Sequence, residues 1–487
     1  MKYISILSQL NSIKYFCRPL KKKKQIIQDL EITDYAAEGK AIGRVEGKII
    51  FVEGAVPGDI ADVLLTRNKK DWAEGRALKI NKFSSERVQP FCKHFGVCGG
   101  CKWQMLPYGK QLEYKQQETE QNLKRIGKIP IPEIRPISGC DSTQYYRNKL
   151  EFTFSNRRYL LQHELDILPN DAEVPGAFGY HVPRIFDKII DIEECFLMDD
   201  INNIIRNKIR SFSLENNFSY YNIKDHSGWL RNVIIRYSSK GELLINVIIG
   251  FEAPEDTNIL MNFILENIKG VNTLLYTVNK KWNDSIYDLE PVIFYGSGFI
   301  TETLGEFNFK ISAKSFFQTN TKQAEKLYAF AKEFAALTGN EVVYDLYCGT
   351  GSIGIFISNQ CKKIIGVDTV AEAISDAKEN ARINNIHHAQ FFTGDVIDIC
   401  NTAFFELHGK PDVIITDPPR AGMHEKLISK LLEIEAPRIV YVSCNVATQA
   451  RDLNLLSAKY QVDKIQPVDM FPHTHHIECI VALTLKT

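Results

Sequence analysis

The sequence predicts an α/β protein in three parts: a small N-terminal β-barrel, a mixed α+β central domain and a C-terminal doubly wound sheet. Short apolar segments separated by glycine turns fill the first part, and β-rich runs mix with irregular connections in the middle. After about residue 311, strands, turns and helices alternate as in a parallel sheet covered by helices. The 487 residues are 44% hydrophobic and 24% charged, which is enough apolar material for several cores.

Changes in this pattern divide the chain. We expect an N-terminal extension, the barrel, the central domain and the α/β domain at residues 1–27, 28–86, 87–310 and 311–487. A helix at about 106–126, inside the central segment, could pack on the C-terminal domain. The basic run Lys21–Lys24 in the extension is interpreted as a solvated tail.

Charge and cysteine content limit the class of protein. The net charge is zero, yet residues 1–135 hold 25 Lys and Arg against 15 Asp and Glu, which indicates an anionic partner or a solvated charged face. Eleven cysteines at irregular spacing are not typical of a secreted disulfide framework. No apolar stretch approaches the roughly 18 residues of a membrane span, and residues 1–16 lack an export signal. We therefore expect a cytoplasmic protein that acts without a membrane.

The barrel is predicted from strands such as Lys48–Val52 and Ile60–Leu65, which are bounded by glycine turns. Four basic residues lie on or beside its later strands: Arg67, Lys69, Lys70 and Arg76. The barrel is interpreted either as an oligonucleotide-binding (OB-like) module or as a purely structural one, because small barrels serve many functions.

A glycine-rich turn in the C-terminal domain predicts a cofactor site. In EVVYDLYCGTGSIGIFIS an apolar strand runs into Gly349, Gly351 and Gly354 and then into a helix. These glycines let the backbone approach a ligand at the carboxyl end of the strand, where open α/β sheets bind ligands. The spacing Gly-x-Gly-x-x-Gly also suits a nicotinamide dinucleotide.

Acidic residues at the next strand ends help to choose between a dinucleotide and S-adenosylmethionine as the cofactor. The strand Lys363–Asp368 ends in an acid placed for ribose hydroxyls in either fold, and Asp395 would lie at the third strand end near the adenine. The fourth strand, Val413–Asp417, is followed by two prolines that fix its terminal carboxylate. Such a carboxylate suits methyl transfer, where a planar base is held against a sulfonium. We therefore favour S-adenosylmethionine over a dinucleotide.

The fifth strand, Arg438–Val442, brings Cys444 to the same edge of the sheet. A free cysteine is most often a buried core residue, but this one lies after a strand between polar neighbours. A thiol is needed to methylate carbon 5 of uracil, because thiolate addition at carbon 6 places electron density on carbon 5. A base must then remove the carbon-5 proton.

The segment Phe471–Glu478, which leads into the predicted strand Ile480–Leu485, offers that base. Three histidines and Glu478 could also suggest a metal site, but positions crowded on one short loop give no obvious tetrahedral set. We therefore prefer Glu478 as the base. Two other cysteines are weaker nucleophile candidates, because Cys348 lies inside the glycine turn and Cys479 should point to the opposite side of its strand.

A second cysteine group lies in the central segment. Cys92, Cys98 and Cys101 form a C-x5-C-x2-C array, and the neighbouring glycines allow a tight wrap around a bound group. Three ligands need a fourth, and on spacing alone zinc and an iron–sulfur cluster remain equal alternatives.

Several segments in the same order resemble the RNA uracil-5-methyltransferase family, and its 23S ribosomal RNA branch in particular, over nearly the whole chain. The matching segments are the barrel, which resembles a TRAM domain, and the runs KSFFQTN, DLYCGTGSIGI, TDPPRAGM, YVSCN with ATQARDL, and MFPHTHHIE. One departure is Val446, because the family usually has proline after SCN. This departure puts the local turn geometry in question more than the chemistry.

The resemblance implies a Rossmann-like methyltransferase domain with Cys444 as the nucleophile and Glu478 as the base. It also implies that Gln318, Tyr347, Asp368 and Asp417 line the cofactor and substrate pocket. Together with the residues found from the strand pattern, the candidate cofactor-binding residues are Gln318, Tyr347, Gly349, Gly351, Asp368, Asp395 and Asp417. The fourth cysteine is implied to be Cys195, and the bound group a [4Fe-4S] cluster that organises the fold or contacts RNA.

The implied reaction is transfer of a methyl group from S-adenosylmethionine to carbon 5 of a uridine in RNA. Ribosomal RNA is favoured because the transfer-RNA branch resembles this chain but lacks the clustered cysteines. The alternatives are a tRNA uracil-5-methyltransferase, a non-catalytic RNA-binding assembly factor, and a radical methylthiotransferase, whose C-x3-C-x2-C motif is absent here. We expect a monomer whose partner is RNA rather than DNA. Three basic residues of the central domain are either phosphate contacts or ordinary surface charges: Arg147, Lys149 and Arg231.

Overall fold

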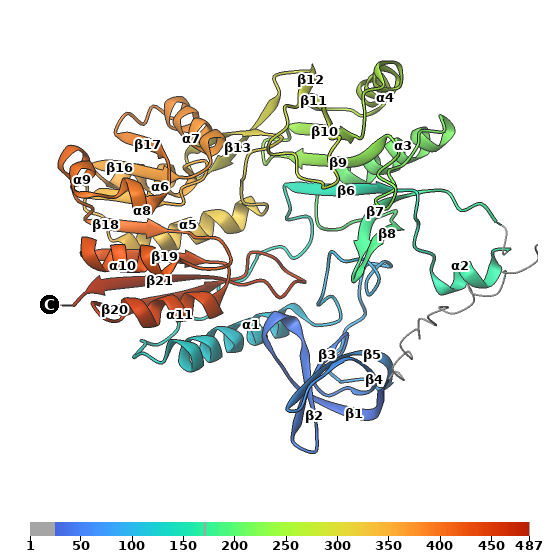
Figure 1. Ribbon diagram of the computed structural model, residues 1–487, viewed down its shortest axis with the longest axis horizontal. Coiled ribbons are helices and arrows are strands. Elements are labelled where there is room, and N and C mark those ends of the chain that lie inside the picture. The colour runs from blue at the N-terminus through green and yellow to red at the C-terminus, as the bar shows by residue number, and fades with distance from the viewer. Residues whose placement is uncertain (1–24, 170–171, 487) are drawn as a thin grey trace, which may run out of the picture. The chain divides into compact units, whose positions relative to one another are not determined.

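The computed structural model describes residues 25–169 and 172–486 (Figure 1). The basic run Lys21–Lys24, the segment 1–16 and most of the predicted N-terminal extension lie outside the described residues. The chain divides into two compact units, one ending at Ser85 and the other made of residues 86–487 with the short segment 37–39. No helix among the described residues is both long and apolar enough to cross a membrane.

The first unit is a closed five-stranded barrel with the strand order β1-β2-β3-β5-β4. Its strands are β1 (Ile26–Tyr35), β2 (Ala41–Val45), β3 (Lys48–Glu53), β4 (Ile60–Asn68) and β5 (Trp72–Lys82). Alternating apolar residues such as Ile50, Val52 and Val63 are buried inside. Gly75 lets β5 approach β4 closely, since a Cβ there would lie 2.5 Å from Cγ1 of Val63. The Arg67 guanidinium lies 4.9 Å from the Trp72 ring centre.

The central part of the second unit is a seven-stranded sheet with the order β12-β11-β10-β9-β6-β7-β8. Its elements are β6 (Lys149–Ser155), α2 (Gln162–Ile167), β7 (Ala177–Val182), β8 (Ile185–Asp191), α3 (Ile201–Glu215), β9 (Leu230–Tyr237), β10 (Leu243–Ile249), α4 (Pro254–Asn267), β11 (Val271–Val278) and β12 (Val292–Tyr295). Among the described strands of this sheet, only the pair β10 and β11, which α4 connects, is parallel. The inner strand β10 is buried along its whole length, and apolar residues of α3 and α4 pack against the sheet.

A hairpin of β13 (Phe299–Leu304) and β14 (Phe307–Ser312) leads into the C-terminal sheet, whose order is β17-β16-β15-β18-β19-β21-β20. Its strands are β15 (Val342–Leu346), β16 (Lys363–Asp368), β17 (Ala389–Thr393), β18 (Val413–Thr416), β19 (Arg438–Ser443), β20 (Tyr460–Val468) and β21 (Glu478–Leu485). The first five are parallel, and β21 runs antiparallel to both of its neighbours.

Helices cover both faces of this sheet, as the sequence predicts for a doubly wound fold (Figure 1). One face packs against α5 (Thr321–Ala335), α6 (Ser352–Ile357) and α7 (Ala371–Ile383). The other packs against α8 (Val396–Ile399), α9 (Thr402–His408), α10 (Glu425–Ile434) and α11 (Val446–Leu456). Because the strands β15 to β19 are parallel, their carboxyl ends meet at one edge, and the antiparallel β21 brings its first residue to that edge.

A helix from the central segment also belongs to this second face. Helix α1 (Tyr108–Asn122) continues into a π-helical turn, Leu123–Gly127, that packs on α11. Leu123 is buried in the core under α11, and the Asn454 side-chain amide donates to the Gly127 carbonyl over 2.7 Å. The chain before α1 carries the three clustered cysteines, so α1 connects that region to the C-terminal sheet.

Candidate active site

The glycine turn after β15 has the left-handed backbone that its sequence implies. The φ angles are +61° at Tyr347, +53° at Gly349 and +74° at Gly351. A Cβ at Gly351 would lie 2.9 Å from Cε1 of Phe391, so both its conformation and its surroundings require glycine. Nothing lies within 4 Å of the corresponding position at Gly349, so the backbone is open to a ligand there.

Carboxylates at the ends of β16 and β17 hold this turn and its neighbours. The Gly349 amide donates to Oδ2 of Asp368 over 2.9 Å, and the Val370 amide donates to Oδ1 over 2.9 Å. Asp395 caps α8 by accepting from the Ile397 amide over 2.8 Å. A carboxylate has about four acceptor positions, so both groups keep acceptors for the hydroxyls or amines of a ligand.

Asp345, inside β15, is a site residue that sequence reasoning missed. It is 1% exposed, and its Oδ2 accepts from the Gly354 amide over 2.9 Å. Its Oδ1 is buried with no hydrogen-bond partner among the described residues. Burial raises the pKa of this carboxyl to about 7. An acid inside the apolar run VVYDL was the available signal, because a lone buried carboxylate is costly without a partner.

The segment before α5 also reaches the glycine turn. The Thr350 hydroxyl donates to the Phe316 carbonyl over 3.3 Å, which joins the KSFFQTN run to the turn. Gln318 is half-buried in this run, and its backbone carbonyl accepts from the Asn148 side chain over 2.9 Å. The predicted position of Gln318 beside the cofactor turn is therefore compatible with the fold.

The loop after β18 carries Asp417 and Arg420, and the buried Asp452 holds this loop by hydrogen bonds. Oδ2 of Asp452 accepts from the Met423 amide and from the Tyr441 hydroxyl, both over 2.8 Å. Burial raises the pKa of Asp417 to about 7. Asp452 is a second residue that sequence reasoning missed, since nothing in the helix pattern of ATQARDL separates it from an ordinary polar position.

Cys444 lies between β19 and α11, held by short-range contacts. Its neighbour Asn445 caps α11 by accepting from the Ala447 amide over 3.1 Å, and the Asn445 side chain donates to the Arg420 carbonyl over 3.1 Å. Val446 is the first residue of α11, a position where proline is also favoured, so valine there leaves the turn intact.

The Cys444 thiol is half-buried, and burial raises its pKa to about 11. The negative charges of Glu478 and Asp417 raise it further, and the Arg420 guanidinium opposes them. The thiol is therefore protonated near neutral pH in the free protein, and a nearby cation is available to favour its anion.

Glu478 is the first residue of β21, two positions earlier than the predicted strand start. Ser443 pairs with Cys479 in the antiparallel pair of β19 and β21. Cys444 and Glu478 lie one position further toward the same edge of the sheet, so they are neighbours across the two strands. The Glu478 carboxyl is 6% exposed, and burial followed by the Asp417 charge raises its pKa. The structure thus brings the predicted nucleophile, the predicted base and the β18 carboxylate together.

The other two cysteines near the site are buried away from it. Cys479 is fully buried in the apolar core on the α11 side of the sheet. Cys348 lies in the core beneath the glycine turn, where its sulfur would be 3.0 Å from a Cβ at Gly366. Neither residue is placed to compete with Cys444.

The three histidines before Glu478 point to different partners. His473 contacts the side chain of Gln111, whereas Nδ1 of His476 lies 3.5 Å from a guanidinium nitrogen of Arg420. Burial lowers the pKa of His473 and His475 to about 4 and that of His476 to about 3, so all three are neutral near pH 7. Within residues 25–169 and 172–486 no group of three or more His, Cys, Asp or Glu side chains is arranged to hold a metal ion.

The four clustered cysteines do meet around one pocket. Cys92, Cys98, Cys101 and Cys195 all line it, together with apolar side chains such as Ile192 and Leu197. The Gly100 amide points at the Cys98 sulfur over 3.4 Å, and the Cys195 amide donates to the Asn203 side chain over 2.8 Å. Sequence spacing could not identify Cys195, which the fold brings to the other three from the segment after β8.

The prediction that Arg231 contacts phosphate is wrong. Arg231 is 2% exposed, and its guanidinium donates to the carbonyls of Asn279 and Lys281 over 2.7 and 2.6 Å and to Asp284 over 2.9 Å. It therefore holds the loop after β11 rather than meeting a ligand. Arg147 is half-buried with its guanidinium 5.5 Å from the Phe471 ring centre, and burial lowers the pKa of Lys149 to about 8.

A doubly wound sheet with a left-handed glycine turn after its first strand and acids at the next two strand ends places the chain in the class of Rossmann-like proteins that bind a dinucleotide or S-adenosylmethionine. Comparison with known proteins narrows this class. Residues 293–486 match the tRNA (Uracil-5-)-methyltransferase family, and residues 22–78 match the TRAM domain. An uncharacterized RNA methyltransferase of Bacteroides thetaiotaomicron is 51% identical over 456 residues, which cover 93% of this chain and 100% of that protein.

More distant relatives agree. An uncharacterized RNA methyltransferase of Chlorobaculum tepidum is 38% identical over 471 residues, covering 95% of this chain and 97% of that protein. The structure is similar to that of the Pyrococcus abyssi tRNA (uracil-54, C5)-methyltransferase in complex with S-adenosyl-L-homocysteine, with a TM-score of 0.72, 28% identity and coverage of 94% and 100% of the two chains. The chain belongs to the RNA uracil-5-methyltransferase family, and it is an S-adenosylmethionine-dependent RNA methyltransferase with a TRAM domain.

Proposed function

We propose that this enzyme methylates carbon 5 of a uridine in 23S ribosomal RNA, through a covalent adduct between Cys444 and carbon 6, with Glu478 as the base. The observation that carries the proposal is the placement of Cys444 and Glu478 at adjacent strand ends beside Asp417. All three lie at the sheet edge that also carries the glycine turn.

S-adenosylmethionine, when bound, supplies an electrophilic methyl group. The residues that would hold it are the open backbone at Gly349, the carboxylates of Asp368 and Asp395, and the half-buried Tyr347 and Gln318. Asp345 adds a buried oxygen that has no hydrogen-bond partner among residues 25–169 and 172–486, which suits a donor group of the cofactor. The donor and acceptor chemistry of this set fits the cofactor.

The remaining steps belong to the chain's own residues. After losing its proton to solvent, the Cys444 sulfur adds to carbon 6, and the ring electron pair moves toward carbon 5. Carbon 5 then bonds to the methyl group as the bond between that methyl group and the sulfonium sulfur breaks. The Glu478 carboxylate accepts the carbon-5 proton, the double bond re-forms and the sulfur leaves as thiolate. Arg420 favours the anionic forms of both Cys444 and Glu478, whose pKa values it lowers against the opposing effect of burial.

We also propose that Cys92, Cys98, Cys101 and Cys195 hold a [4Fe-4S] cluster. Four thiols around one pocket with apolar walls fit its ligand set, whereas zinc is the competing occupant. When bound, the cluster would join the segment before α1 to the segment after β8. Protein purified without oxygen should contain iron and sulfide at about four each per chain, whereas a colourless protein with zinc alone would contradict the assignment.

The clustered cysteines favour ribosomal RNA as the substrate, because the transfer-RNA branch of the family, which the chain also resembles, lacks them. The similarity to the P. abyssi tRNA enzyme favours transfer RNA as the second candidate. Mapping 5-methyluridine in both RNAs from a deletion strain decides between them. Complementation with Cys444→Ala should restore no 5-methyluridine, and restored methylation would overturn the covalent mechanism.

A further inference from the structure

The loop that delivers Glu478 is held by side chains from helix α1. This loop, Asp469–Ile477, joins β20 to β21, and Glu478 follows it directly. Gln111 and Lys115 are four residues apart on α1, so they share one helix face, and both side chains are completely buried. An ordinary packed helix would carry apolar residues at these positions, so their polarity calls for partners in the loop.

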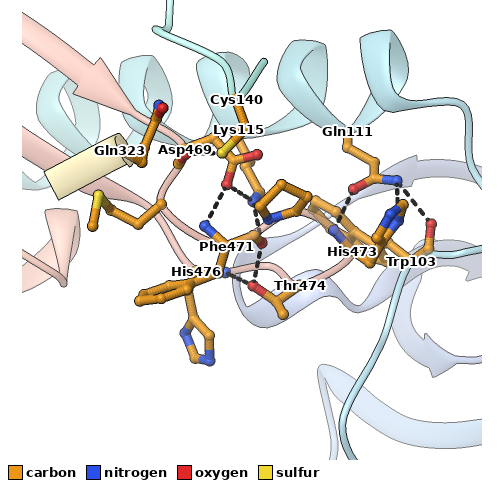
Figure 2. Close-up of polar contacts among 12 residues, drawn as sticks. Trp103, Gln111, Lys115, Cys140, Gln323, Asp469, Phe471, His473, Thr474 and His476 are labelled. Carbon is orange, nitrogen blue, oxygen red and sulfur yellow. Dashed lines mark hydrogen bonds and ion pairs between the residues drawn. The ribbon is translucent and has the colours of Figure 1, made fainter. Parts of the chain in front are cut away.

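Lys115 fixes the start of the loop. Its ammonium lies 2.7 Å from Oδ1 of Asp469 and 3.3 Å from the Phe471 carbonyl, and neither partner of this ion pair is exposed. Oδ2 of Asp469 accepts from the Tyr108 hydroxyl over 2.8 Å. Oδ1 also accepts from the Phe471 amide over 3.0 Å (Figure 2). A buried ion pair with every polar atom partnered selects one geometry more than it adds stability.

Gln111 fixes the middle of the loop at His473. Its Oε1 accepts from the His473 amide over 2.8 Å, and its Nε2 lies 3.1 Å from Nδ1 of the same residue (Figure 2). Nε2 also donates to the carbonyls of Trp103 and Leu106 over 3.1 and 3.0 Å. One amide therefore contacts both the backbone and the ring of His473.

His473 adopts a conformation that needs such support. Its φ is +64°, in the left-handed region, which costs a residue with a side chain on the order of 1 kcal/mol or more. Its carbonyl accepts from the amides of Lys102 and Trp103 over 2.7 and 3.0 Å, so both peptide groups of the residue are held. Only four residues separate His473 from Glu478, so the direction of the chain at His473 limits how the loop enters β21.

We propose that Gln111 is a positioning residue for the base: by holding His473 in its left-handed conformation, it sets the approach of Glu478 to the carbon-5 proton. This inference rests on the covalent mechanism proposed above. It predicts a selective defect, because Cys444 is held by contacts around β19 and α11 that do not involve Gln111.

The test compares Gln111→Leu with Gln121→Leu, an identical change at an exposed position of the same helix. Three quantities are measured: methyl transfer turnover, the fraction of enzyme trapped as a denaturant-stable RNA adduct, and S-adenosylhomocysteine affinity. Gln111→Leu should lower turnover about tenfold, raise the trapped fraction and leave the affinity within about twofold of wild type. Gln121→Leu should match the wild type in all three.

A parallel loss of turnover and adduct in Gln111→Leu, or unchanged turnover, would overturn the proposal. If that variant loses cofactor binding, Gln111→Glu decides, because it keeps the oxygen that accepts from the His473 amide and loses the amide donors. Slower turnover with more adduct supports the proposal, and wild-type behaviour or a joint loss contradicts it. Cys444→Ala separates the two levels, since methylation or adduct formation by that variant would reject the covalent mechanism itself.

Discussion

The two reacting groups are held in different ways. Cys444 directly follows β19, and the residue after it caps α11, so its position depends on contacts made within a short stretch of chain. Glu478 follows the loop Asp469–Ile477, which is held by α1 and by other segments far away in the sequence, with 362 residues separating Gln111 from His473. The nucleophile is therefore built into the sheet edge, whereas the base depends on a remote segment. Changes to α1 or to the cysteine segment should affect proton removal more than thiol addition.

The largest effect is expected from a change of the base Glu478 itself. Glu478→Gln should lower turnover by roughly 10² to 10⁴ while a covalent protein–RNA adduct accumulates, because addition and methyl transfer proceed without proton removal. Denaturing gel electrophoresis with labelled RNA measures the adduct. The double variant with Cys444→Ala should form none, and rapid clean turnover by Glu478→Gln would assign the base elsewhere.

A change on the sheet side should affect the cofactor instead. Asp345→Asn keeps an oxygen for the Gly354 amide but replaces the unpartnered buried oxygen with a donor, so S-adenosylhomocysteine affinity should fall about tenfold. Calorimetry measures this affinity. Asp412→Asn is the matched control, because Asp412 accepts from the Val342 amide at the opposite end of the same strand, and it should bind normally. Equal affinities in the two variants would remove Asp345 from the cofactor site.

Changes in the cysteine pocket should affect proton removal by Glu478 and leave thiol addition by Cys444 unaffected. Lys102 and Trp103, which donate to the His473 carbonyl, directly follow Cys101. Cys101→Ala should therefore lose the iron of the proposed cluster and turn over several-fold more slowly, with a larger trapped adduct fraction than wild type. Cys361→Ala, at a buried cysteine distant from the pocket in sequence, should keep its iron. Iron loss with unchanged turnover and adduct would break the proposed link.

The smallest expected effect is on the pH dependence of the free energy of unfolding. Burial raises the pKa of Asp345 to about 7 from an ordinary value of 3.8, so the folded protein binds more protons than the unfolded chain between these values. The contribution of this group to the free energy of unfolding is therefore present at low pH and lost as pH rises through about 7. Asp345→Asn should reduce this decline in denaturant titrations from pH 5 to pH 8. An unchanged slope would show that the carboxyl titrates normally.

Sequence patterns identified the sheet-edge part of the site and missed the part held from a distance. The strand ends placed Asp368, Asp417 and Cys444 at one edge, because each follows an apolar run and parallel strands align their carboxyl ends. The loop partner Gln111 looked like an ordinary polar residue of a helix, since its role depends on contact with His473 far along the chain. Arg231 was mistaken for a surface cation because burial beneath a loop leaves no local signal.

By itself, the sequence determined the alternation of strands and helices, the glycine turn and the residues that follow each strand, because these depend on backbone sterics and short-range hydrophobic periodicity. Only the tertiary structure decided that Glu478 opens β21 beside Cys444, that Cys195 joins the other three cysteines, and that α1 holds the loop before the base. These features arise from packing between segments far apart in the chain. The burial and hydrogen-bond partners that define such contacts exist only once the segments have come together.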